Sequence, residues 1–481
     1  MCVCRCSLYL ACLAMTNKVD VHGGTVWTMI WWGVKLSLKF VSNVILTRLL
    51  TPDMFGIAAI GNTLMSGINM FSDFGISQNI VRSPRSDDHY LQTAWTVQLL
   101  RGVVITVILL LLAKPFAWFY QVDGLATFLM IVAVSNMAMG LNNIESLLDY
   151  RHATLRKIAI IDIVGAIFGL GVMVLWAWFS PSYVALAVGA LATTSLFTLG
   201  TYLAYSRHNC RLRLEKEAMI DMIGFGKWVL ISTIFAFVTM QMDRIALGKM
   251  VSMHVLGLYS LAWMWASMPG QILEQWASRV FFPLVSQYVR DETAMKTIWF
   301  ARRLYVLIAV ATASVMYALS DILVSILYPF EYQGVSLFIR QLSVVFLLYT
   351  IEQSYSHVLV AHGRPREKVI GQLMSVILFG VALLPAFYWA NIAGVVVLLA
   401  VASGVRILWM AYKLFTNKLA ELWFDFIAVG TFFPIAILLH YIVGAFDNRW
   451  YQISAAFTTG TATLIITLVA YQRLRSICES T

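Results

Sequence analysis

Charged residues are scarce in this sequence. Asp, Glu, Lys and Arg make up 12% of its 481 residues, about half of the roughly 25% that is usual in soluble domains. Hydrophobic residues make up 60%, and a chain this apolar cannot cover itself with polar surface in water. These proportions exclude a soluble globular protein and predict an integral membrane protein.

Motifs for nucleotide and metal chemistry are also missing. No Gly-x-x-x-x-Gly-Lys-Ser/Thr loop occurs, so we do not expect the chain to consume ATP. Four of the six cysteines lie within the first twelve residues, without a Cys/His cluster downstream to complete a zinc site. The sequence therefore predicts no catalytic residues, no metal and no cofactor.

The net charge of +10 comes from Lys and Arg residues that lie in short segments between apolar runs, not in one domain or tail. This distribution suits anionic lipid headgroups and the setting of membrane topology. We therefore expect membrane lipids as partners, and no nucleic acid.

Apolar runs long enough to cross a bilayer as helices recur along the whole chain. They predict an all-α fold with about fourteen transmembrane helices. The expected spans are 25–47, 54–81, 91–119, 124–147, 158–180, 183–205, 222–248, 254–286, 298–328, 333–361, 368–390, 392–414, 423–444 and 451–472. Pro269-Gly270 offers a bend point in the eighth span, because proline removes a backbone hydrogen bond.

Basic residues are concentrated in alternate connections. A cytoplasmic N-terminus places most of them on the cytoplasmic side, among them Arg151, Arg156 and Lys157, and leaves the other side with few, such as Arg48 and Lys114. Because cytoplasmic connections carry the excess of Lys and Arg, we predict that both termini are cytoplasmic.

The sequence contains an internal repeat. Residues 48–57 are echoed by residues 249–258, so that Gly56 corresponds to Gly257 at an offset of 201. Six spans in each copy make the two halves parallel, the construction of many transporters with a site between their halves. The same offset relates three polar pairs, namely Ser66 with Ser267, Asp73 with Glu274, and Arg101 with Arg302.

This repeat divides the chain into regions. Residues 1–14 are expected to be a non-structural leader or a misassigned start, with Met15 as the alternative first residue. The remaining regions are an N-lobe of helices 1–6 (15–206), a basic cytoplasmic connector (207–221), a C-lobe of helices 7–12 (222–415), and helices 13–14 with a cytoplasmic tail (416–481).

Several charged residues lie inside the predicted spans. Lys35 and Lys39 lie one turn apart in the first span, and Lys227 lies near the cytoplasmic start of the seventh. A charge in hydrocarbon costs at least about 2.5–3.5 kcal/mol on insertion scales. These lysines therefore indicate a water-filled cationic cavity, which would attract diphosphates.

Polar residues form stripes on the second and eighth spans. The candidates for a polar stripe are Asn62, Ser66, Asn69, Ser267 and Gln271. Hydrogen bonding between helices also explains such residues. Three acids, Asp73, Glu274 and Asp243, need a cation beside them or protonation, so they are candidates for ion coupling or for simple pairing.

Two arginines, Arg101 and Arg302, are equivalent under the repeat and lie near the cytoplasmic ends of their spans. They fit the cationic cavity and positive-inside anchoring equally well. Three other acids, Glu145, Asp149 and Asp162, are expected to pair with the basic cluster at 151–157.

The motifs resemble one family. Its pattern is matched by residues 47–56 (TRLLTPDMFG), 71–79 (FSDFGISQN), 100–102 (LRG), 256–262 (LGLYSLA) and 281–284 (FFPL). These segments resemble the polysaccharide-transporter branch, the O-antigen and exopolysaccharide flippases, of the multidrug/oligosaccharidyl-lipid/polysaccharide flippase superfamily.

The resemblance implies two six-helix lobes in a V around a central cavity, alternating access, and two extra C-terminal helices. It also implies a substrate made of a sugar chain on an isoprenoid diphosphate, moved from the cytoplasmic to the outer leaflet of the inner membrane. Lys35, Lys39, Asp73, Lys227 and Glu274 lie on the helices where family members carry cavity residues. Coupling to H⁺ or Na⁺, and partnership with a polysaccharide polymerase and a chain-length regulator, stay open.

Two other functions are alternatives to this one. A cation-coupled multidrug exporter would share the fold. Such an exporter usually presents acidic residues to organic cations, whereas Lys35 and Lys39 favour an anionic substrate. A membrane polysaccharide polymerase or ligase is less favoured, because the outward connections are short and almost uncharged.

Overall fold

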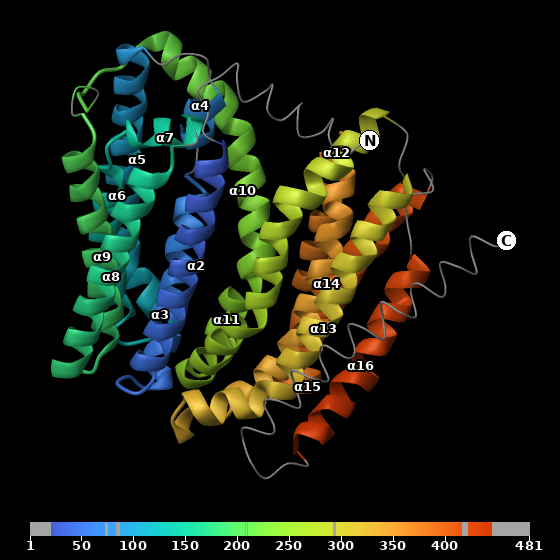
Figure 1. The fold of residues 1–481 in the computed structure, drawn as a ribbon. Coiled ribbons are helices and arrows are strands. Elements are labelled where there is room, and N and C mark those ends of the chain that lie inside the picture. The colour runs from blue at the N-terminus through green and yellow to red at the C-terminus, as the bar shows by residue number, and fades with distance from the viewer. Residues whose placement is uncertain are drawn as a thin grey trace. The chain divides into compact units, whose positions relative to one another are not determined.

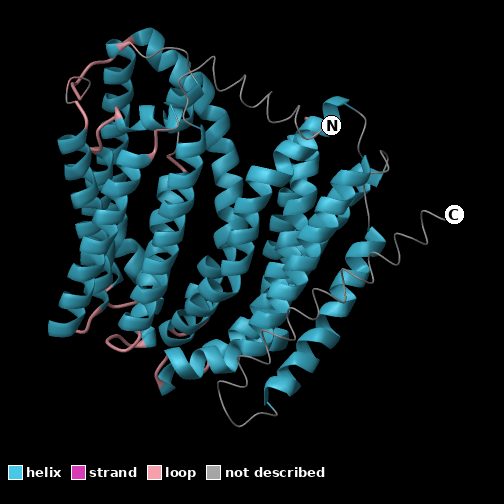
Figure 2. Ribbon diagram, in the orientation of Figure 1, coloured by secondary structure: helices cyan, strands magenta, loops and turns pink. Residues whose placement is uncertain are grey.

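The structure is a computed structural model that describes residues 21–72, 76–82, 87–152, 154–206, 208, 210–291, 295–415 and 422–444. The chain forms two compact units (Figure 1). Unit 1 comprises Met1–Phe237 with Ser252–His254, and unit 2 comprises Val238–Val251 with Val255–Thr481. Helices and short connections account for the described residues, and no strand occurs among them (Figure 2).

Unit 1 is a bundle in which α8 packs on α9, α5 on α6, and α2 on α8. Its helices begin where the sequence supplies starting signals. Pro52 stands at the first position of α3, where its missing N–H costs nothing, and the Asp87 carboxylate accepts a hydrogen bond from the Tyr90 backbone N–H at 3.2 Å as the cap of α5. The helices are α2 (Val21–Leu46), α3 (Pro52–Met70), α4 (Ile76–Arg82), α5 (Asp88–Tyr120), α6 (Leu125–Gly140), α7 (Ser146–His152), α8 (Arg156–Phe179), α9 (Tyr183–Ala204) and α10 (Lys216–Met250), of which α10 continues into unit 2.

Unit 2 is built around α13 and α14, which pack on each other, with α15 against α14 and α16 against α13. Its core includes Phe281, Tyr305, Tyr355 and Phe432, all buried. The elements are α11 (Met253–Trp276), a π-helical segment (Ala277–Phe281), α12 (Phe282–Asp291), α13 (Met295–Leu327), a 3₁₀ turn (Phe330–Tyr332), α14 (Val335–Ala361), α15 (Pro365–Phe415) and α16 (Leu422–Gly444).

Each predicted span that falls within the described residues coincides with helical structure. The second, fourth and eighth spans are subdivided, into α3 and α4, into α6 and α7, and into α11, the π-helical segment and α12. The expected bend point at Pro269 lies inside α11, which continues as an α-helix to Trp276. The last predicted span, 451–472, lies outside the described residues, so the predicted total of fourteen is not established.

The eleventh and twelfth predicted spans are joined in α15 and separated by a short non-helical break. Ala390 and Asn391 depart from helical geometry, and Asn391 has a φ of 51°. Asn tolerates this left-handed conformation better than most residues do. The break therefore falls at the boundary that the sequence predicts.

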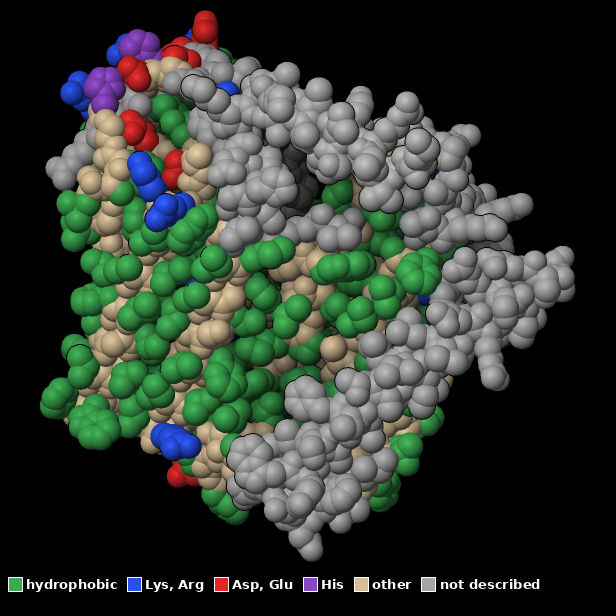
Figure 3. Space-filling view, in the orientation of Figure 1, with side chains coloured by type: hydrophobic (Ala, Val, Ile, Leu, Met, Phe, Trp, Pro, Cys, Tyr) green, Lys and Arg blue, Asp and Glu red, His purple; other side chains and the backbone are tan. Residues whose placement is uncertain are grey.

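The lengths and surfaces of the helices suit a bilayer. Eight described helices are long and apolar enough to cross a membrane. Figure 3 shows hydrophobic side chains along the sides of unit 1, with charged and His side chains gathered at the end that holds the α9–α10 connection, where Arg211 and Arg213 are exposed. This is the surface of a multi-pass membrane protein.

Candidate functional site

The two predicted lysines of α2 are both exposed. Lys35 Nζ lies 2.7 Å from Asp162 Oδ2 of α8, and the Trp31 indole N–H donates to the same oxygen at 2.6 Å. The side chain of Lys35 is 49% exposed and that of Asp162 is 14% exposed. Asp162 thus pairs with Lys35, a partner that the sequence did not predict, and the pair links α2 to α8.

The neighbouring acid Asp149 belongs to a polar cluster beside α7. Its carboxylate accepts hydrogen bonds from the Tyr205 hydroxyl and from Thr154 Oγ1. Burial and this hydrogen bond to Asp149 raise the pKa of Tyr205 far above its ordinary value. Tyr205 therefore stays neutral and keeps donating to Asp149 at physiological pH.

The polar stripe of α3 runs along the helix as expected. Asn62 is exposed, whereas Ser66 and Asn69 are half-buried. Asp73, the acid predicted to end this stripe, lies outside the described residues. Its predicted role in coupling or pairing stays a prediction.

Arg101 reaches from α5 to the C-terminal end of α3. Its Nη2 donates to the Asn69 backbone carbonyl at 2.9 Å, and its Nε donates to Ser72 Oγ at 3.3 Å. A cation at this end complements the helix dipole and satisfies a terminal carbonyl. These contacts tie α5 to the end of α3, and both interpretations of Arg101, as a cavity residue and as a positive-inside anchor, stay predictions.

A polar cavity of about 250 Å³ lies within unit 1, between α3 and helices α5 to α9. Side-chain amides dominate its polar lining, which includes Asn69, Gln98, Asn136 and Asn142. Gln98 Nε2 donates to the carbonyls of Gly140 and Asn142 at 3.2 and 2.9 Å, which holds the end of α6 against α5. Asn69 was predicted from the sequence, whereas Gln98, Asn136 and Asn142 were not.

In unit 2, the stripe on α11 is connected by hydrogen bonds. Gln271 Nε2 donates to Ser267 Oγ at 2.9 Å. One turn further, Glu274 Oε1 lies 3.2 Å from His357 Nε2 of α14, and Glu274 Oε2 is buried without a hydrogen-bond partner in the described structure. His357 was not predicted from the sequence, and its contact with Glu274 links α11 to α14.

Arg302 is fully buried in the core of unit 2. Its Nη2 donates to both carboxylate oxygens of Asp425 on α16, at 2.9 and 2.7 Å, and its guanidinium lies over the Tyr355 ring, 4.1 Å from the ring centroid. The Tyr355 hydroxyl donates to the same carboxylate. Asp425 therefore compensates the charge of Arg302 inside unit 2, and the place of Arg302 in a substrate pathway or as a positive-inside anchor stays a prediction.

The remaining predicted charges lie on α10. Asp243 is buried and accepts a hydrogen bond from the Tyr259 hydroxyl at 2.7 Å, while Arg244 lies over the Trp263 ring at 4.0 Å from its centroid. Asp243 and Arg244 therefore have separate neighbours, as their adjacent positions on one helix predict. The side chain of Lys227 lies outside the described residues.

A buried ion pair in unit 2 was missed by the sequence analysis. Arg406 Nε of α15 donates to Glu352 Oε2 of α14 at 2.7 Å, and Arg406 also donates to Ser375 and Ser403. Both residues stand in apolar runs, which is a signal for a paired or functional charge. The hydrogen bond from Arg406 to Glu352 connects α15 to α14.

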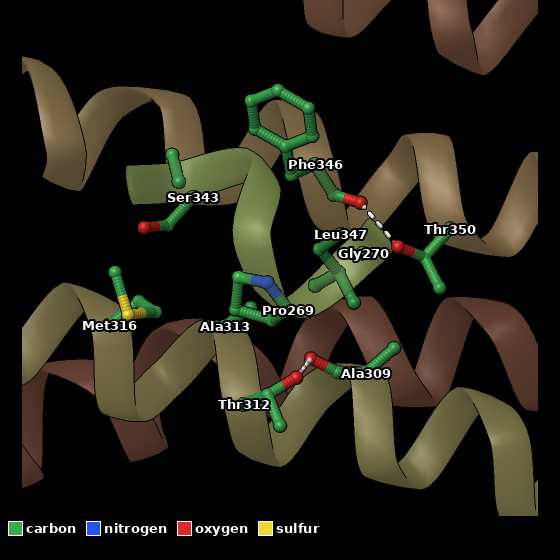
Figure 4. Close-up of a pocket in the computed structure, with 11 residues that line it drawn as sticks. Pro269, Gly270, Ala309, Thr312, Ala313, Met316, Ser343, Phe346, Leu347 and Thr350 are labelled. Carbon is green, nitrogen blue, oxygen red and sulfur yellow. Dashed lines mark hydrogen bonds between the residues drawn. The ribbon is translucent and has the colours of Figure 1, made fainter. Parts of the chain in front are cut away.

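A second cavity lies beside Pro269 of α11 (Figure 4). Its volume is about 10 Å³, enough for about one water molecule. Thr350 and Thr312 donate to the carbonyls of Phe346 and Ala309 in their own helices, at 2.7 and 3.1 Å. The cavity is therefore a packing gap at the proline and is too small for a substrate.

Long apolar helices that carry paired or exposed charges define a multi-pass membrane protein. The chain belongs to the polysaccharide biosynthesis protein family, whose profile matches residues 45–337. This membership confirms the resemblance that the sequence motifs indicated.

Comparison with known proteins agrees with this assignment. The chain is 20% identical over 353 residues to the lipopolysaccharide biosynthesis protein WzxC of Escherichia coli (strain K12), covering 73% of this chain and 72% of that protein. Its fold is similar to that of the lipid II flippase MurJ in an inward closed conformation, with a TM-score of 0.73 and 13% identity over 94% of this chain and 99% of MurJ. It is also similar to an inward-facing multidrug resistance MATE family transporter of the MOP superfamily, with a TM-score of 0.60 and 14% identity over 80% and 95% of the two chains.

Proposed function

We propose that this protein is a flippase that moves an isoprenoid-diphosphate-linked oligosaccharide from the cytoplasmic to the outer leaflet of the inner membrane, for synthesis of a surface polysaccharide such as O-antigen, capsule or exopolysaccharide. The family match over residues 45–337 carries this proposal. The fold shared with MurJ supports it and favours a transporter over a polymerase or ligase.

The proposal answers a physical problem. A diphosphate-sugar headgroup cannot cross hydrocarbon unaided, because each polar group without a hydrogen bond costs several kcal/mol there. Lys35 and Lys39 on α2 would offer cations to the diphosphate. The Lys35–Asp162 pair suits this role, since the side chain of Lys35 is 49% exposed and could exchange its carboxylate partner for a diphosphate, while the Trp31 indole N–H still donates to the more buried Asp162.

The finer features of the proposal extend the predictions from sequence. Movement would proceed by alternating access between the predicted lobes, 15–206 and 222–415, with both termini in the cytoplasm. Coupling to H⁺ or Na⁺ would use Glu274, Asp243 or Asp73. A polysaccharide polymerase and a chain-length regulator are the proposed partners, because they would act on the product.

The test is translocation by the purified protein in liposomes. A lipid-diphosphate-linked oligosaccharide with a fluorescent sugar is placed in the membrane, and the fraction accessible to an impermeant quencher is followed in time. We expect faster exchange between leaflets than in protein-free liposomes. Exchange at the protein-free rate, in liposomes shown to contain folded protein, would contradict the proposal.

The likeness to a MATE transporter makes a multidrug exporter the second candidate. The same liposomes loaded with a cationic dye separate the two functions. Dye movement without movement of the lipid-linked oligosaccharide would favour the exporter, whereas the lysines of α2 predict the reverse.

A further inference from the structure

An unsatisfied hydrogen-bond donor belongs to a residue in the wall of the polar cavity of unit 1. Asn136 on α6 lines this cavity and is only 3% exposed, yet its Nδ2 has no hydrogen-bond partner in the described structure. A buried amide without a partner has lost its hydrogen bonds to water and gained none in return, which is unfavourable. Such a group in a cavity of about 250 Å³ indicates a ligand, or water that a ligand replaces.

The neighbouring polar groups supply acceptors beside this donor. Both amide hydrogens of Gln98 are engaged by the carbonyls of Gly140 and Asn142, so Oε1 is the group that Gln98 can still offer as an acceptor. The amide of Asn69 lines the same cavity from α3. Amides that together donate and accept match hydroxyl groups, which also do both.

The apolar part of the lining suits the carbon skeleton of a sugar. Tyr150, Phe197, Ile105 and Met139 line the cavity together with the amides. Binding sites for small molecules combine such apolar walls with a few convergent polar groups. A sugar ring presents apolar C–H faces and a rim of hydroxyls, so it meets both kinds of lining.

The charges of the lining disfavour other ligands. No acidic side chain occurs among the described lining residues, which argues against an organic cation. Arg101 is the basic residue of the described lining, and it donates to Ser72 and to the end of α3. A diphosphate is best held by several charge-assisted donors, and this cavity does not supply such a set.

We propose that the cavity of unit 1 is a binding site for one uncharged sugar residue, recognised by the amides of Asn136, Gln98 and Asn69. The inference rests on the proposed function for the origin of this sugar, which would be a residue of the translocated headgroup. The site lies wholly within unit 1 and is separate from the lysines proposed to meet the diphosphate.

The experiment measures binding of monosaccharides to the full chain in lipid nanodiscs. The probes are D-glucose, D-galactose and N-acetyl-D-glucosamine, followed by saturation-transfer NMR, with inorganic phosphate and a cationic dye as comparison ligands. We expect saturation of at least one sugar, without competition by phosphate or dye. No saturation of any of the three sugars, or displacement of the sugar by phosphate, would overturn the proposal.

The variant Asn136→Leu keeps the approximate size of the side chain and removes its hydrogen bonds. We expect about five- to tenfold weaker sugar binding, the effect of losing one or two neutral hydrogen bonds. Gln333→Leu is the control, because Gln333 is an exposed amide of unit 2 and does not line the cavity. Equal binding by wild type and Asn136→Leu would refute the assignment.

A second variant protects the test against misfolding. Asn69→Ala removes a lining amide but keeps the backbone carbonyl that accepts from Arg101. If Asn136→Leu does not fold, weakened binding by Asn69→Ala supports the site and unchanged binding refutes it. The translocation assay separates the two proposals. Translocation by a protein that binds no sugar would contradict only this inference. Sugar binding without translocation would contradict only the proposed flippase activity.

Discussion

His254 Nδ1 lies 3.3 Å from Asp53 Oδ2, and these two residues are equivalent under the 201-residue repeat. Both side chains are substantially exposed, at 42% and 56%, so the contact itself contributes little stability. The close approach of Gly56 to Met253, beside this contact, contributes more to stability. A Cβ atom added at Gly56 would lie 2.0 Å from the Met253 carbonyl oxygen, so the repeated glycine permits α3 to approach the segment Ser252–His254 within unit 1.

Gly56→Ala is therefore expected to destabilise the protein by about 1–3 kcal/mol, because the contact is with backbone that cannot turn aside. Thermal unfolding in detergent, followed by intrinsic fluorescence, measures the loss. Gly33→Ala in α2 is the control, since a Cβ there meets nothing within 4 Å. An equal effect of the two substitutions would contradict the close approach.

The buried pair Arg302–Asp425 predicts a large loss of stability when one partner is removed. Asp425→Asn leaves the Arg302 guanidinium without a compensating charge, and Arg302→Met leaves the Asp425 carboxylate without one. Either change costs about 3–5 kcal/mol of stability. We expect the double variant to be more stable than either single variant, as measured by denaturant unfolding. The exposed pair Arg340–Asp321 is the control, and its truncation should change stability by about 0–1 kcal/mol.

The sequence predicted the helices much better than their partners. Apolar runs and their punctuation locate the helices, down to the break at Asn391 in α15. The ion pairs join residues far apart in the chain, 127 residues for Lys35–Asp162 and 123 for Arg302–Asp425. No periodicity within one helix specifies which distant helix packs against it, so these partners had to come from the structure.

The same limit applies to the candidate site. The sequence predicts Lys35 and Glu274 as site candidates because charges in apolar runs are conspicuous. Glu352 and Arg406 carry the same signal but were not among the predicted candidates. The amides lining the cavity of unit 1 carry no charge. Gln98 and Asn136 become significant only when α5 and α6 are placed side by side.

Glu274 and His357 lead to a prediction about ion coupling. If this pair carries a transported proton, Glu274→Gln should abolish the stimulation of translocation by an imposed pH gradient, while basal exchange continues. The matched substitution Asp243→Asn changes an acid that is hydrogen-bonded to Tyr259 and should leave the stimulation intact. The reverse pattern in liposome assays would move the coupling role to Asp243.

Lys35 and Lys39 predict how the diphosphate is engaged. The double variant Lys35→Ala/Lys39→Ala should lower the translocation rate at least about tenfold, the equivalent of 1.4 kcal/mol, because two charge-assisted contacts to the diphosphate are lost. Normal translocation by this variant would remove the argument for a cationic cavity.

Asp162→Asn tests the same contact from the other side. The carboxylate competes with a diphosphate for Lys35, whose Nζ lies 2.7 Å from it. Removing the negative charge should therefore strengthen binding of the lipid-linked substrate, measured as a lower KM in the liposome assay. A purely structural role for the pair predicts the opposite, a weaker α2–α8 contact and a lower melting temperature without tighter binding. Measuring KM and melting temperature on the same preparation distinguishes the two roles.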